Sequence, residues 1–130
     1  MRASESKDRL REFNDGLAAI TSETIASVLG RTVWEAYANY LRNSVGFSVD
    51  EIPAHLRALF NSLRQLFGVG GDVLAKRIVK SLYAEYGIEL TIREGRSLED
   101  YVEELKERFL RGRLPIAHAK RLDTKNGGVT

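Results

Sequence analysis

Apolar residues recur at three- and four-residue steps through almost the whole chain, and this pattern limits the possible folds more than any other feature. Side chains at these spacings lie on one face of an α-helix, so each such stretch predicts a helix with one buried side. Glycines interrupt the pattern at Gly30, Gly46, Gly68 and Gly87, where a left-handed residue commonly ends a helix. The 130 residues, 43% of them apolar, suffice for one domain with a core. The sequence therefore predicts a single all-α domain, a bundle of about five helices over residues 1–111.

The pattern also sets approximate helix limits, at residues 4–29, 32–45, 53–67, 72–86 and 98–111. Ser97 is expected to cap the start of the last helix. The fourth helix is apolar over more than half of its circumference, so we expect it to be the most buried, with Leu74, Ile78 and Leu82 nearly inaccessible to solvent. Ser48 and Glu51 form a capping-box pattern before Pro53, which predicts a turn there and a helix beginning at the proline. Residues 88–92, Ile-Glu-Leu-Thr-Ile, alternate and predict a short extended segment with no evident partner strand.

Composition excludes several classes of site. The chain has no cysteine, so it contains no disulfide, thiolate metal site or cysteine nucleophile. No apolar run reaches the roughly 20 residues of a membrane span, and the polar N-terminus is unlike a signal peptide. We therefore expect a cytoplasmic protein that does not enter a membrane. The 14 arginines against 6 lysines also indicate a thermophilic source.

Charge is distributed unevenly along the chain. Residues 1–107 hold 14 basic and 17 acidic side chains, whereas residues 108–130 hold 6 basic and 1 acidic. The sequence thus predicts a mildly acidic body and a basic, flexible tail over residues 112–130. Such a tail can contact nucleic acid or an acidic partner. The candidate contacts are Arg111, Arg113, Lys120 and Arg121.

The three glycines between Gly68 and Gly71 allow two interpretations. Glycine amides before a helix can bind a phosphate. A P-loop, however, follows a strand and ends in Gly-Lys-Ser/Thr, whereas this segment follows a helix and leads into Asp72. We favour a structural corner, with Gly68 ending the third helix at a positive φ and Asp72 at or next to the start of the fourth.

No set of residues makes a convincing catalytic or metal site. His55 and His118 are far apart and have no carboxylate at metal-ligand spacing. No serine lies in a nucleophile elbow. The aromatic residues Trp34, Tyr37, Tyr40 and Tyr83 can line a small-molecule pocket, but core packing is the favoured interpretation. We therefore expect no enzyme activity, no cofactor and no metal.

The first helix carries a stripe spaced like a coiled-coil seam, formed by Leu10, Phe13, Leu17 and Ile20. The other four helices can cover one another's apolar faces, which leaves this stripe for a partner. A second copy of the chain would bury it, so we expect a homodimer. The alternative is that this helix folds back onto its own bundle.

Two segments carry a resemblance to a known family. The stretch IPAHLRALFNSLRQLFGVGGDVLAKRIVKSLYAEYGIEL and the following GRSLEDYVEEL resemble an archaeal family of small helical domains of unknown function, described as a Nitrosopumilus-type signalling output domain. The resemblance covers roughly residues 13–109 and is most evident at Phe67-Gly68, residues 78–83, Gly87 and residues 97–101. It implies an archaeal source, an all-helical fold and no known catalytic residues.

These observations favour a non-catalytic interaction or output module of archaeal signalling or regulation. Its expected partners are a second copy and an unidentified protein. The alternative is a nucleic-acid-associated protein that uses the basic tail.

Overall fold

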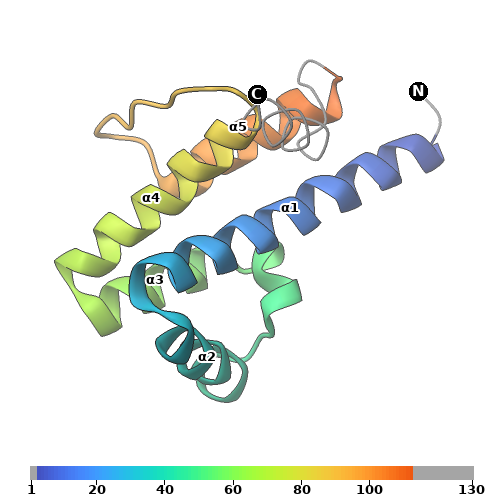
Figure 1. Cartoon of the computed structure of the whole chain (residues 1–130). Helices are drawn as coiled ribbons and strands as arrows, with labels where there is room; N and C mark the ends of the chain where they lie inside the picture. The colour runs from blue at the N-terminus through green and yellow to red at the C-terminus, as the bar shows by residue number, and fades with distance from the viewer. Residues whose placement is uncertain (1–2, 113–130) are drawn as a thin grey trace, which may run out of the picture.

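The computed structural model describes residues 3–112, with side chains from residue 7 onward, and in this part the chain is all-α with no strand (Figure 1). The predicted fold class is confirmed. The elements are α1 (Ala3–Leu29), α2 (Arg31–Tyr40), the π-helical turn η1 (Leu41–Val45), the 3₁₀ segment η2 (Val49–Ala54), α3 (Leu56–Phe67), α4 (Val69–Glu85) and α5 (Leu98–Leu110). None of these helices is both long and apolar enough to cross a membrane.

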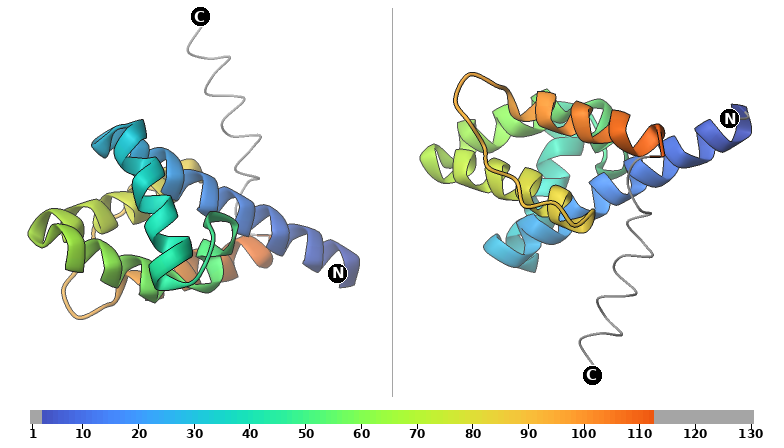
Figure 2. Two further views of the ribbon diagram at one scale, coloured as in Figure 1. Left: turned by 90° about the horizontal axis from the view of Figure 1, so that it is seen from below. Right: turned by 90° about the horizontal axis from the view of Figure 1, so that it is seen from above.

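The long helix α1 organises the bundle. It contacts α2, η2, α4 and α5, while α3 and α4 pack against each other as an antiparallel hairpin. In Figure 1, α1 and α4 run side by side in opposite directions. The two further views in Figure 2 place the α3–α4 corner at one end of the molecule, opposite the start of α1. The hairpin therefore forms a protruding end of the bundle.

The core is built from the predicted apolar faces. The fourth helix contributes seven buried residues, more than any other helix in the described part of the chain. Leu74, Ile78 and Leu82 on this helix are 3%, 0% and 1% exposed. The prediction that these three side chains are almost inaccessible is confirmed.

The candidate dimer seam lies largely in this same core. Phe13 and Leu17 are 0% and 1% exposed within a single chain, and Ile20 is also buried, whereas Leu10 is 38% exposed. The ring of Phe13 packs against the rings of Tyr86 and Phe109, with centroids 6.1 and 5.9 Å away. The premise that the first helix has an uncovered apolar face is therefore wrong, because α4 and α5 cover it.

The corner between α3 and α4 is tighter than predicted. Gly68 has a φ of 59° and ends α3, as expected, but α4 already begins at Val69. The prediction that Asp72 lies at or next to the N-cap of α4 is wrong, since the N-cap is Gly68 and Asp72 lies inside the first turn. A Cβ on Gly71 would lie 1.9 Å from the carbonyl oxygen of Leu63. Glycine at this position therefore permits the two helices to meet backbone to backbone.

The start of the third helix also differs from the prediction. Pro53 does not begin α3 but lies inside η2, and α3 starts three residues later at Leu56. The predicted capping box is present, with the amide of Ser48 donating to Glu51 Oε1 at 2.9 Å. His55 has a φ of −132° and a ψ of 34°, which interrupts the helical path. The chain therefore makes a separate 3₁₀ turn before the longer helix.

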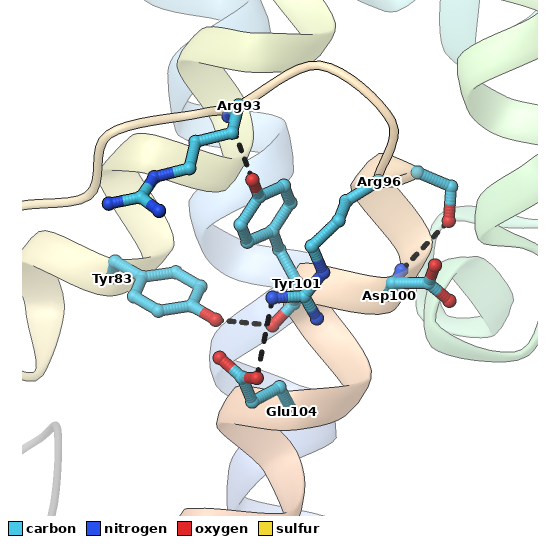
Figure 3. A network of polar contacts seen from close by, with 7 residues as sticks. Tyr83, Arg93, Arg96, Asp100, Tyr101 and Glu104 are labelled. Carbon is cyan, nitrogen blue, oxygen red and sulfur yellow. Dashed lines mark hydrogen bonds and ion pairs between the residues drawn. The ribbon is translucent and has the colours of Figure 1, made fainter.

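The segment between α4 and α5 is held by two tyrosines (Figure 3). The hydroxyl of Tyr83 donates to the carbonyl of Tyr101 at 2.5 Å, and the hydroxyl of Tyr101 accepts from the amide of Arg93 at 2.8 Å. The guanidinium of Arg96 lies 4.5 Å from the centre of the Tyr101 ring. Residues 88–92 form no strand, and their alternate apolar side chains are half-buried against the core. Contacts with side chains thus position this segment without a partner strand.

Candidate interaction surface on the α3–α4 hairpin

The α3–α4 hairpin has a net positive charge that the net charge of the whole chain does not reveal. Residues 56–85 hold five basic and two acidic side chains, a net charge of +3. Residues 7–55 and residues 86–112 each hold five basic and seven acidic side chains, a net charge of −2 in both cases. All five basic side chains of the hairpin are exposed, namely Arg57, Arg64, Lys76, Arg77 and Lys80. The folded body is therefore polarised, with a net positive charge on the α3–α4 hairpin because this segment carries few acidic side chains.

The corner of the hairpin also exposes large apolar side chains. Leu66 and Phe67 at the end of α3 are 46% and 37% exposed, and Val69 and Val73 at the start of α4 are 83% and 59% exposed. We call these four residues the corner patch. Single exposed apolar residues are ordinary, but a cluster at one protruding corner is typical of a binding surface.

Val69 and Val73 of the patch share one face of α4 with the cations of that helix. Residues three, four, seven and eleven positions apart lie on the same side of a helix. The exposed side of α4 accordingly presents the α4 stripe, which comprises Val69, Val73, Lys76, Arg77 and Lys80. At about 1.5 Å per residue, the stripe extends about 16 Å, or three turns, from its apolar end to its basic end.

One carboxylate at the edge of this stripe links the two helices of the hairpin. Asp72 pairs with Arg64 of α3 at 3.1 Å and with Lys76 of α4 at 3.1 Å. The hydrogen bond from Lys76, followed by that from Arg64, holds the pKa of Asp72 below its usual value. Arg77 and Lys80 have no ion pair among the described residues. These two cations are therefore available to an external anion.

The predicted sites fall elsewhere. Of the candidate tail contacts, Arg111 is exposed at the end of α5, while Arg113, Lys120 and Arg121 lie outside the described residues, as does His118. His55 stacks on Phe47, with ring centroids 4.7 Å apart. In the part of the chain that the structure describes, no three histidine, aspartate or glutamate side chains gather as metal ligands.

The aromatic set divides into two separate places. Trp34 and Tyr37 are buried, and the hydroxyl of Tyr37 lies 2.6 Å from Ser62 Oγ. Tyr40 is half-buried beside Tyr37, whereas Tyr83 is buried far along the chain against α5. Tyr37 and Tyr83 are therefore core residues with hydrogen-bonded hydroxyls, as the favoured interpretation expects. They do not come together around a common pocket.

The difference in charge between the body and the tail does not reveal the hairpin surface, because the hairpin lies within the mildly acidic body. A local signal existed, since residues 56–71 contain two arginines and no acidic residue, and Lys76, Arg77 and Lys80 follow within one helix. Which of these face solvent depends on how α3 and α4 pack.

Comparisons with protein-family models, curated proteins and solved structures gave no match for this chain.

Proposed function

We propose that this protein is a non-catalytic interaction module that binds a macromolecular partner through the α3–α4 hairpin. The observation that carries the proposal is the corner patch of Leu66, Phe67, Val69 and Val73, which are 37–83% exposed beside the cations of α4. Apolar area next to charges that can select a partner is the usual composition of a protein interface. The close backbone packing at Gly71 supports this role, because it brings together the two helices that carry the surface.

An archaeal signalling or regulatory setting belongs to the same proposal and rests on the family resemblance. It predicts that a kinase or a receiver domain is encoded beside this chain. A homodimer remains a prediction, although the stripe from Phe13 to Ile20 no longer supplies its interface.

Site-specific photo-crosslinking in the source cells tests the interaction. We would place a photoreactive phenylalanine at Val73 on the hairpin and, as a matched control, at Glu103 on the exposed side of α5. The proposal expects a discrete adduct from position 73 that is absent from position 103. Equal labelling from the two positions, or none from position 73, would contradict it.

The alternative is a nucleic-acid-associated protein that uses the basic tail. It is supported by the six basic side chains against one acidic in residues 108–130. A mobility-shift assay with DNA and RNA at two salt concentrations distinguishes it, because phosphate contacts weaken steeply as salt rises.

A further inference from the structure

We infer that the partner seated on the α3–α4 hairpin is an acidic amphipathic helix of another protein. Its apolar side chains cover the corner patch, and its carboxylates pair with the cations further along α4. This inference rests on the proposed interaction function and adds the chemical class of the partner.

The shape of the α4 stripe calls for an elongated occupant. Val69 and Val73 lie one turn apart, and Lys76, Arg77 and Lys80 occupy the next two turns of the same exposed face. Over about 16 Å the surface changes from apolar to basic. An occupant that matches it carries apolar side chains at one end and acidic side chains over its following turns, as a helix of about four turns does.

The charges on the hairpin select an acidic partner. Arg77 and Lys80 have no carboxylate partner among the described residues, and Arg64 and Lys76 share the single carboxylate of Asp72. A carboxylate brought to Arg77 or Lys80 therefore forms a new ion pair without breaking one. Complementary charges of this kind steer partners and exclude those of like charge.

Three segments of the chain itself match this surface poorly. Its own residues 113–130 hold four basic and one acidic side chain, so the cations of α4 repel them. The hairpin of a second copy carries the same net charge of +3. Helix α5 of a second copy is acidic, but none of its large apolar side chains is exposed, so it cannot cover Val69 and Val73.

Two other anionic partners fit the surface less well. A nucleic-acid backbone would pair with the cations, but its phosphates would leave the apolar side chains of Val69 and Val73 uncovered. Insertion of the corner into an anionic membrane would bury Val69 and would also draw in the carboxylate of Asp72, one turn away. Removing that carboxylate from water opposes insertion.

A binding assay with designed peptides tests the inference on the full-length chain. The probe is a fluorescent helical peptide of about four turns, with two leucines one turn apart near one end and glutamates along the same face. A matched peptide has lysine in place of each glutamate. We expect fluorescence anisotropy to show saturable, salt-sensitive binding of the glutamate peptide and at least tenfold weaker binding of the lysine peptide.

Variants on the two ends of the stripe locate the binding. Arg77→Glu with Lys80→Glu should weaken binding of the glutamate peptide about tenfold or more, because two attractions become repulsions. Val69→Ser with Val73→Ser should weaken it at unchanged helical circular dichroism, since both side chains are exposed. Lys7→Glu with Arg11→Glu, an equal charge change on the exposed side of α1, is the control and should leave affinity unchanged.

Three outcomes would overturn the inference. They are equal binding of the two peptides, no binding of either at millimolar concentration, and an equal loss in the α1 control. Duplex DNA or phosphatidylserine vesicles that bind through Arg77 and Lys80 while the glutamate peptide does not would assign the surface to another class of partner. None of these results would change the crosslinking expected from position 73. Failure of this inference is therefore distinct from failure of the proposed function.

Discussion

Gly71 lies so close to Leu63 that a Cβ on the glycine would be 1.9 Å from the leucine carbonyl oxygen and 2.4 Å from its carbonyl carbon. Both neighbours are backbone atoms, so they cannot move aside as a flexible side chain would. This contact sets the separation of α3 and α4 at the corner and hence the geometry of the candidate interaction surface.

Gly71→Ala should therefore destabilise the protein by about 1–3 kcal/mol, as overpacking usually does. The matched control is Gly70→Ala, because nothing lies within 4 Å of a Cβ at that position. The control should keep or slightly raise stability, since alanine favours a helix over glycine. Urea denaturation of both variants measures the difference, and equal midpoints would contradict the role given to Gly71.

Ile78 provides a test of the core. It is 0% exposed on α4, so Ile78→Ala should lower the free energy of unfolding by about 2–5 kcal/mol. Val73→Ala on the same helix is the control, because Val73 is 59% exposed and should change stability by no more than about 0.5 kcal/mol. Thermal or urea unfolding followed by circular dichroism distinguishes them. An unchanged unfolding transition for Ile78→Ala would contradict the placement of Ile78 in the core.

The first-helix stripe gives a test of monomer against dimer. The double substitution Phe13→Asp and Leu17→Asp places two carboxylates in the chain's own core, where both side chains are at most 1% exposed. We expect it to abolish most helical circular dichroism, because unpaired buried charges are costly. Leu10→Asp, at a side chain 38% exposed, should be tolerated. A double variant that keeps its helical circular dichroism but has half the mass of the unmodified protein in light scattering would show that the stripe is a dimer interface.

The buried tyrosines predict loss of stability at alkaline pH. Burial raises the pKa of Tyr37 and of Tyr83 to about 12, whereas a tyrosine of the unfolded chain keeps its ordinary pKa of about 10. Above that value the unfolded state releases protons that the folded state retains, so stability falls as pH rises from about 10 to about 12. Stability against urea at pH 9 and pH 11 checks the sign. Replacing Tyr83 by phenylalanine should reduce the dependence on pH.

The basic tail gives a prediction about nucleic acid. We expect weak binding or none near physiological salt, because Arg111, Arg113, Lys120 and Arg121 are spread along a segment of the sequence and are not expected on one folded face. A mobility-shift assay of the whole chain and of a chain lacking residues 112–130 is decisive. Sub-micromolar binding that disappears with the deletion would place the alternative function first.

The sequence by itself determined that most of the chain becomes helical and which side chains of α4 lie deepest in the core. Leu74, Ile78 and Leu82 were predicted correctly, as was the cap of Ser97, whose hydroxyl accepts from the amide of Asp100 at 3.1 Å. These features depend on residues three or four positions apart, so local periodicity and capping chemistry are enough to reveal them.

The tertiary structure alone decided which apolar and charged faces remain in contact with water. Phe13 and Leu17 have the same spacing whether α4, α5 or a second chain covers them, and the covering helices lie far away in the sequence. The close approach of α3 to α4 likewise depends on the contact between Gly71 and Leu63. The candidate surface follows from that same packing, because the interhelical contacts that bury one side of α4 leave Val69, Val73, Arg77 and Lys80 exposed on the other.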